Sequence, residues 1–217
     1  MSPEPATVTV TVRTEGVGLT GDLALPDDAT GVVLFAHGTG SSRLSPRNQA
    51  VAAHLNQAGL GTLLLDLLTA AEDLQDARSG EHRFDVDLLG RRLTGAADWL
   101  AERTTHLPVG LFGASTGAAA ALMTAAERPE IVRAVVSRGG RPDLAEKWLP
   151  GVRAPVLLLV GEHDDSVLEL NRLAAEALTA PAELLVIPKA THLFPEPGAL
   201  EQVAEEAARW FAGMAAE

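Results

Sequence analysis

The chain has 217 residues, of which 47% are hydrophobic and 21% are charged, and this balance predicts one folded domain over residues 1–217. It contains no cysteine, which excludes disulfides, thiolate metal sites and a cysteine nucleophile. The formal net charge is −12, so phosphate backbones and anionic membrane surfaces repel the chain, and we expect neither nucleic acid nor membrane as a partner.

Two segments with alternating polar and apolar residues come first. Residues 7–13 alternate as a half-buried strand does, and residues 17–25 form a second candidate strand that ends at Pro26 and two aspartates. Together they predict an N-terminal hairpin. The first residues carry no basic, apolar leader, and no apolar run approaches the roughly 18 residues of a membrane span, so we expect a cytoplasmic protein.

Short continuous apolar runs then alternate with helical segments. Runs of this length are typical of strands buried on both faces of a parallel sheet. They cover residues 31–36, 61–65, 108–112, 131–136, 155–160 and 184–187. Helices are expected between and after them, at residues 46–58, 85–103, 116–127, 166–178 and 197–213. The alternation predicts an α/β fold with a mostly parallel sheet flanked by helices.

One longer segment, residues 67–84, lacks this pattern. It is acidic and contains glycine, and we expect an irregular loop or lid there.

A G-x-S-x-G pattern, Gly113 to Gly117, follows one apolar run directly and precedes an alanine-rich helix. On a sharp turn from strand to helix, the central Ser115 is exposed at the end of the strand, while the glycines allow close approach of neighbouring backbone. The start of the helix supplies N–H groups and a positive dipole to a developing oxyanion. The pattern therefore predicts that Ser115 is a nucleophile.

A second loop after a buried strand reads His37-Gly38-Thr39-Gly40. A tetrahedral oxyanion needs two converging donors, of which one follows the nucleophile and one comes from a loop after an earlier strand. We expect the backbone N–H groups of Thr116 and Thr39 to fill these roles. The ring of His37 is expected to brace the loop.

The general base has to be chosen from six histidines, namely His37, His54, His82, His106, His163 and His192. His192 is favoured because it lies just after the last predicted strand, and open α/β sheets place their sites at the carboxyl ends of strands. The acid is expected after the preceding strand, where Asp164 is favoured and Asp165 is the alternative, with Asp143 less favoured. The chain order is then nucleophile, acid, base.

These residues predict a serine hydrolase. His192 removes the Ser115 proton as the hydroxyl attacks an acyl carbon, and Asp164 fixes the tautomer and stabilises the charged ring. The chemistry requires no metal and no organic cofactor. The expected partner is a small-molecule acyl substrate.

With these motifs, the chain from about residue 18 onwards resembles the α/β-hydrolases, and specifically the dienelactone hydrolase family. The resemblance is carried by residues 37–40, the elbow at 113–117, the Gly161-x-x-Asp164-x-x-Val167 segment and the Thr191-His192-Leu193-Phe194 loop. It implies an eight-stranded sheet, without a large cap domain in a chain this short. The founding members use a cysteine nucleophile, whereas this chain has serine there, which speaks against dienelactone as the substrate and favours a serine esterase-like member.

Arginines cluster after two of the expected strands. Arg43 and Arg47 follow the oxyanion loop, and Arg138 and Arg141 follow the strand at 131–136. We expect Arg43 and Arg138 to contact a substrate carboxylate or phosphate, while salt bridges to acids such as Asp66 or Asp143 are the alternative. Two other functions stay open, a non-catalytic binding protein of the same fold and an acyltransferase or perhydrolase that uses the same triad.

Overall fold

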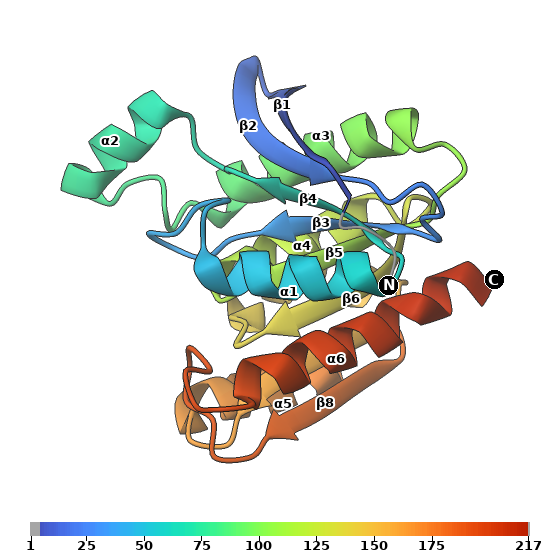
Figure 1. Cartoon of the computed structure of the whole chain (residues 1–217). Helices are drawn as coiled ribbons and strands as arrows, with labels where there is room; N and C mark the ends of the chain where they lie inside the picture. Colours follow the sequence, from blue (N-terminus) through green and yellow to red (C-terminus); the bar gives the residue numbers. More distant parts are fainter. Residues whose placement is uncertain (1–4, 217) are drawn as a thin grey trace.

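The computed structural model of the chain describes residues 5–216 and shows an eight-stranded sheet with helices on both faces (Figure 1). The strands are β1 (Thr7–Thr14), β2 (Val17–Ala24), β3 (Val32–Ala36), β4 (Gly61–Leu65), β5 (Val109–Ala114), β6 (Val132–Arg138), β7 (Val156–Gly161) and β8 (Ala182–Ile187). Their order across the sheet is β1-β2-β4-β3-β5-β6-β7-β8. β2 is antiparallel to β1 and β4, and the other neighbouring pairs are parallel. The predicted mostly parallel α/β sheet is confirmed.

Helices cover the sheet in two layers. On one face, α1 (Pro46–Gln57) and α6 (Ala199–Ala212) pack against each other in front of the central strands (Figure 1). On the other face lie α3 (Val86–Arg103), α4 (Thr116–Glu127), α5 (Asp165–Ala177) and the 3₁₀ segment η1 (Pro142–Gly151), and a short turn η2 (Gly213–Ala216) follows α6. None of the helices within residues 5–216 is long and apolar enough to cross a membrane.

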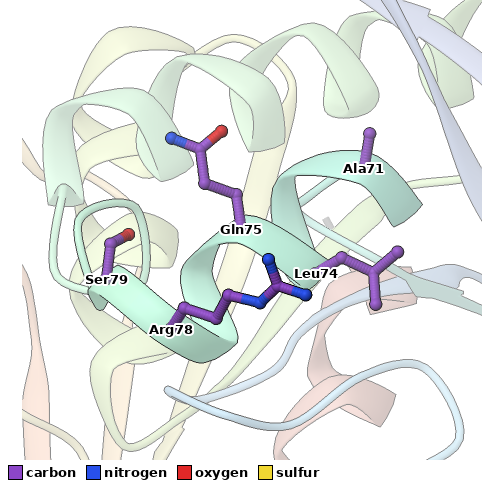
Figure 2. A pocket seen from close by; sticks show the side chains of 5 residues that line it. All are labelled: Ala71, Leu74, Gln75, Arg78 and Ser79. Atoms are coloured by element: carbon purple, nitrogen blue, oxygen red, sulfur yellow. The ribbon is translucent and has the colours of Figure 1, made fainter.

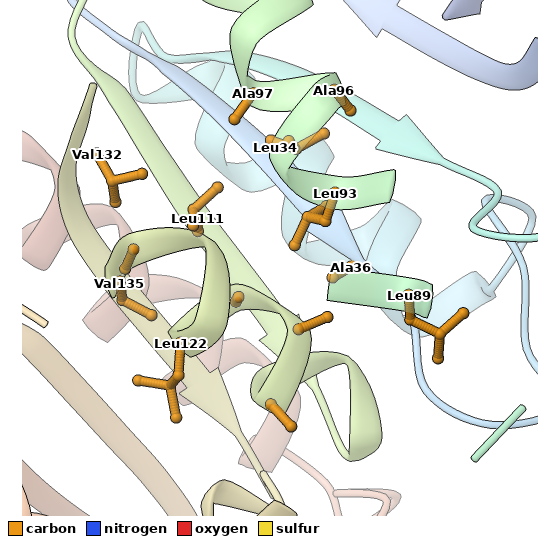
Figure 3. Close-up of a cluster of buried hydrophobic side chains, with 14 of the residues drawn as sticks. Leu34, Ala36, Leu89, Leu93, Ala96, Ala97, Leu111, Leu122, Val132 and Val135 are labelled. Carbon is orange, nitrogen blue, oxygen red and sulfur yellow. The ribbon is translucent and has the colours of Figure 1, made fainter. Parts of the chain in front are cut away.

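The core explains why the central strands read as continuous apolar runs. On the α3/α4 side, Leu34, Leu111 and Val135 pack against Leu93 and other helix side chains (Figure 3). Residues one step along the same strands point to the α1/α6 side, where the rings of Phe35 and Phe112 stack with their centroids 4.8 Å apart. Each such buried side chain contributes about 1.5–3 kcal/mol relative to an exposed one.

The prediction that residues 67–84 are irregular is wrong, because they contain the helix α2 (Ala70–Ser79), which projects from the edge of the molecule (Figure 1). Its start is a capping box. The Thr69 hydroxyl accepts the Glu72 N–H at 3.3 Å, and the Glu72 carboxylate accepts the Thr69 N–H at 2.8 Å.

An ion pair fixes α2 to the body of the protein. Arg92 of α3 is 3% exposed, donates to Glu72 at 2.6 and 2.8 Å, and donates to the Leu67 carbonyl at 2.9 Å. The hydrogen bonds from Arg92 lower the pKa of Glu72 to about 2, against the opposing effect of burial. The first turn of α2 is therefore held against α3 by the ion pair between Glu72 and Arg92.

Candidate active site

The site lies where the strand order reverses. β4 is beside β3 on one side and β5 is beside it on the other, so the chain turns in opposite directions on leaving β3 and β5. Such a switch point opens a crevice at the carboxyl ends of the strands. Thr39 follows β3 and Ser115 follows β5, so both residues stand at this crevice.

Ser115 is held in a strained turn between β5 and α4. Its backbone has φ 51° and ψ −120°, a conformation that costs a residue with a side chain of the order of 1–3 kcal/mol. The flanking glycines permit it. A Cβ on Gly117 would lie 2.3 Å from the Ala36 carbonyl oxygen, and a Cβ on Gly113 would lie 2.4 Å from the Cα of Ala118. The geometry of a nucleophile elbow, expected from the sequence motif, is present.

Three of the predicted residues come together. Ser115 Oγ lies 3.4 Å from His192 Nε2, and His192 Nδ1 lies 2.6 Å from Asp164 Oδ2. The exposed fraction of the side chain falls from 38% at His192 to 12% at Asp164, so the histidine faces the crevice and the carboxylate lies behind it. Asp165, the alternative acid, is exposed, and the carboxylate of Asp143 pairs with Arg141.

Two loops hold the acid and the histidine in this arrangement. Gly161 ends β7 so close to the loop after β8 that a Cβ would lie 2.4 Å from the Ala190 carbonyl oxygen. That carbonyl accepts the N–H of His163 at 2.9 Å, and the Glu162 carboxylate accepts the N–H of Lys189 at 2.7 Å. These two bonds hold the loop after β7, which carries Asp164, against the loop after β8, which carries His192.

The two predicted oxyanion donors meet, but in a different way from that expected. The N–H of Thr39 donates to the hydroxyl of Thr116 at 2.9 Å, and the two hydroxyls are also 2.9 Å apart. The Thr116 N–H opens α4, where it has no partner within the helix. The N–H of Thr116 is therefore not used within the helix, whereas the N–H of Thr39 is bound to the Thr116 hydroxyl.

His37 braces the oxyanion loop. Its Nε2 accepts the N–H of Leu67 at 3.0 Å, which leaves Nδ1 to donate to the Gly38 carbonyl at 3.0 Å. Burial lowers the pKa of His37, so the ring is neutral at physiological pH, as this pair of bonds requires.

The four arginines divide into two pairs. The guanidinium of Arg43 bonds Asp22 at 3.0 Å and Asp66 at 2.8 Å, so the structure favours the salt-bridge alternative over the predicted substrate contact. Arg141 is likewise paired with Asp143. Arg138 and Arg47, in contrast, form no ion pair within residues 5–216. The sequence places Arg47 in the same cluster as Arg43, but Arg43 was the residue expected to contact the substrate.

The described residues show no metal cluster, and the surface hollow along α2 contains no predicted site residue. No group of three or more His, Asp or Glu side chains between residues 5 and 216 is placed to hold a metal ion. The hollow in Figure 2 is lined only by residues of α2, namely Ala71, Leu74, Gln75, Arg78 and Ser79. None of the predicted site residues lines it.

The fold and the placement of the elbow are those of an α/β-hydrolase. Residues 19–214 match the model of the dienelactone hydrolase family, and the chain belongs to that family.

Solved structures agree with this placement. A dienelactone hydrolase from Anabaena variabilis is 56% identical, with 97% of this chain and 99% of that chain covered and a TM-score of 0.95. Est1E from Butyrivibrio proteoclasticus is 17% identical over 96% of this chain and 99% of that one, with a TM-score of 0.80, and shows the same fold.

A longer relative carries a different name. A protein of Mycobacterium tuberculosis named phosphoribosyl transferase is 53% identical over 197 residues, which are 90% of this chain. They make up 44% of that relative, so the chain spans less than half of its length. The name belongs to the longer protein as a whole.

Proposed function

We propose that the chain is a serine hydrolase of small carboxylic esters, lactones or thioesters, working through Ser115, His192 and Asp164. The observation that carries the proposal is the continuous contact from Ser115 Oγ through His192 to Asp164, on a strained elbow at the switch point of the sheet. The name of the Anabaena relative supports lactones among the substrates.

In the first half of the reaction, Ser115 Oγ forms a bond to the acyl carbon as His192 Nε2 takes the hydroxyl proton. The carbonyl electron pair moves onto oxygen. Asp164 accepts the Nδ1–H of His192, which leaves Nε2 free to act as base and stabilises the imidazolium once it forms. When the oxyanion collapses, the bond to the leaving group breaks, and the leaving group takes the proton from Nε2.

In the second half, a water attacks the acyl-Ser115 carbonyl while His192 Nε2 accepts a proton from the water. Collapse of the second oxyanion returns that proton to Ser115 Oγ and releases the acid. The cycle consumes one ester or thioester and one water and gives one acid and one alcohol or thiol. A lactone and one water give a single hydroxy acid.

The oxyanion is stabilised by backbone N–H groups. The N–H of Thr116 faces it from the start of α4, where the positive end of the helix dipole adds to the attraction. The N–H of Thr39 joins it once the Thr116 hydroxyl rotates away from that donor. The second donor is thus recruited by the developing charge.

A fluorophosphonate probe tests the proposal directly, because it labels only an activated serine. We expect the wild type to be labelled at Ser115 and to hydrolyse small 4-nitrophenyl esters, and Ser115→Ala to lose both properties. Ser166→Ala, at an exposed serine in the first turn of α5, is the matched control and should retain both. A folded wild type that neither reacts with the probe nor turns over any ester or lactone would contradict the proposal.

A further inference from the structure

Residues 67–83, which form the α2 arm, are joined to the oxyanion loop at both of their ends. At the start of the arm, the N–H of Leu67 donates to Nε2 of His37 at 3.0 Å. At its end, the carbonyl of Arg83 accepts the hydroxyl of Thr39 at 3.2 Å. Between these two bonds the chain leaves the body of the molecule and returns to it (Figure 1). The α2 arm therefore begins and ends on the loop that carries an oxyanion donor.

The buried side chain of the α2 arm is a carboxylate. Among residues 70–79, which form α2, Asp76 alone is buried, with 2% of its side chain exposed. Its Oδ1 accepts the N–H groups of His82 and Arg83 at 2.7 and 3.1 Å, and its Oδ2 accepts the Nε–H of Arg83 at 2.6 Å. Nη2 of Arg83 donates to the Asp76 carbonyl at 2.5 Å. These bonds fold residues 80–83 back onto the end of the helix and fix the place of the Arg83 carbonyl.

Asp76 is ionised at neutral pH. Burial opposes its ionisation, but the N–H groups of His82 and Arg83 and the guanidinium of Arg83 outweigh burial and lower the pKa of Asp76. A buried ion pair adds little net stability, because both charges lose hydration when they are buried, but it can specify one arrangement of the chain. The pair of Asp76 and Arg83 is therefore better explained by what it positions than by the stability that it adds.

The group next to this pair is the hydroxyl of Thr39. A carbonyl oxygen can only accept, so Thr39 Oγ1 donates to Arg83 and accepts from the Thr116 hydroxyl at 2.9 Å. The N–H of Thr39 is bound to the same Thr116 hydroxyl. That hydroxyl has to rotate away before the N–H can reach an oxyanion, and the bonds between the two threonines are then lost. Of the three hydrogen bonds that Thr39 makes within residues 5–216, the bond to Arg83 remains.

We propose that Asp76 and Arg83 are positioning residues, which keep the N–H of Thr39 directed at the oxyanion while the Thr116 hydroxyl is turned away. The proposal rests on the hydrolase function proposed above and makes α2 part of its machinery. Binding of the ester does not need this rearrangement, so the pair acts on the transition state. Loss of one oxyanion donor typically lowers kcat about 10²- to 10³-fold, and a donor that is present but poorly held should cost about 10- to 50-fold.

Steady-state kinetics with 4-nitrophenyl acetate separate an effect on catalysis from an effect on binding. Asp76→Asn keeps the shape of the side chain and removes the charge that holds Arg83. We expect kcat to fall about 10- to 50-fold and KM to stay within about twofold of the wild type, because acylation and deacylation both pass through an oxyanion. Labelling with the fluorophosphonate probe to completion counts the reactive sites, so kcat is expressed for each labelled Ser115.

Matched variants distinguish the ion pair from the α2 arm in general. Arg83→Met should resemble Asp76→Asn, whereas Arg83→Lys can still pair with Asp76 and should recover part of the rate. Glu81→Gln removes one carboxylate from an exposed position of the arm, and Arg78→Met removes one guanidinium from its outer hollow (Figure 2). Neither control should change kcat. Equal losses in the controls would overturn the proposal, because the charge of the arm as a whole would then be responsible.

A double-mutant cycle tests the connection through Thr39. Thr39→Val keeps the N–H and removes the hydroxyl that the Arg83 carbonyl accepts, while Thr39→Ser keeps both. In the Thr39→Val background, Asp76→Asn should lower kcat by less than about twofold, because the connection to the α2 arm is already broken. Full multiplication of the two losses would overturn the proposal, since Asp76 would then act on the reaction by another path.

Amide hydrogen exchange measures the same connection without turnover. Asp76→Asn should speed exchange at the Thr39 amide at least about tenfold, and Glu81→Gln should leave it unchanged. The amide of Leu158, in the buried strand β7, reports unfolding of the whole domain and should exchange equally in all three proteins. Faster exchange at Leu158 by the same factor as at Thr39 would mean that Asp76 supports the fold as a whole, and it would overturn the positioning role.

These measurements separate failure of the positioning role from failure of the hydrolase function. A folded wild type without esterase activity would overturn the hydrolase function, and with it the catalytic role of the α2 arm. An active wild type in which Asp76→Asn changes neither kcat nor exchange at Thr39 would overturn the positioning role alone. A loss confined to KM would also overturn it, because the pair would then act on substrate binding.

Discussion

Thr39 and Thr116, 77 residues apart in the chain, are joined by two hydrogen bonds that connect the oxyanion loop to the nucleophile elbow. The Thr39 hydroxyl continues the chain by donating to the Arg83 carbonyl at 3.2 Å. With Thr39 Oγ1 donating to Arg83, Thr116 is the donor between the two hydroxyls. The Thr116 hydroxyl thus accepts a hydrogen bond from the Thr39 N–H and donates one to the Thr39 hydroxyl.

Replacement of that hydroxyl should loosen the oxyanion loop. Thr116→Val removes both bonds, and at about 1 kcal/mol for each we expect a loss of about 2 kcal/mol in the free energy of unfolding. Ester kcat/KM should fall about tenfold, because the loss of the bonds that hold the oxyanion loop in place outweighs the release of the Thr39 N–H. Thr116→Ser keeps the hydroxyl and should resemble the wild type in urea unfolding and in kinetics. If Thr116→Ser lost as much stability and activity as Thr116→Val, the methyl group of Thr116 and not its hydroxyl would hold the loop.

The carboxylate behind His192 should be essential for rate but not for folding. Asp164→Asn keeps the shape but favours the wrong histidine tautomer, and we expect kcat to fall about 10³- to 10⁴-fold. The side chain makes no capping bond to α5, so the Tm should change little. Asp165→Asn, at the exposed neighbour, is the control for the loss of one charge. Comparable rates for the two variants would argue against Asp164 as the acid.

The elbow glycine should be intolerant of any side chain. Gly117→Ala places a Cβ 2.3 Å from the Ala36 carbonyl oxygen, where backbone of β3 and of α4 would have to separate. We expect the free energy of unfolding to fall by about 3 kcal/mol or more. Gly213→Ala meets open space at the end of α6 and should be neutral or stabilising by up to about 1 kcal/mol. Chemical denaturation compares them, and equal stabilities would contradict the close packing.

The anchor of α2 should make stability depend on acid pH. The pKa of Glu72 is about 2 in the folded protein against an ordinary 4.5. This stabilisation is therefore fully present above pH 4.5 and is lost as the pH falls toward 2. The shift corresponds to at most about 3 kcal/mol, and solvent screening at this partly exposed group reduces it.

Urea unfolding at pH 6 and pH 3 measures the effect. Glu72→Gln should be less stable than the wild type at pH 6, and the difference should shrink at pH 3. Asp73→Asn changes an exposed carboxylate in the same helical turn and is the control. A difference that does not depend on pH would mean that Glu72 acts through packing and not through its charge.

Most of the architecture could be predicted because buried parallel strands have a simple pattern. The run predicted at 61–65 coincides with β4, and the helix predicted at 116–127 coincides with α4. The elbow could be predicted because strained backbone between close-packed elements requires glycine at two fixed positions. Local sequence determines all of these features.

Features that depend on distant residues could be predicted less well. The helix α2 was missed because it packs little apolar surface and leaves Leu74 70% exposed, although Thr69 and Glu72 carry the spacing of a capping box. The partners of Arg43 come from β2 and from the end of β4, and only the folded sheet brings them together. For the same reason, the bond from the Thr39 hydroxyl to the Arg83 carbonyl could not be predicted.

The segment from Arg138 to Arg141 supports Ser115 entirely through main-chain hydrogen bonds. Such bonds form with almost any amino acid at position 138, so the side chain there is free to change while the attacking oxygen stays in place. A substitution at position 138 would thus leave the main-chain bonds that position Ser115 intact.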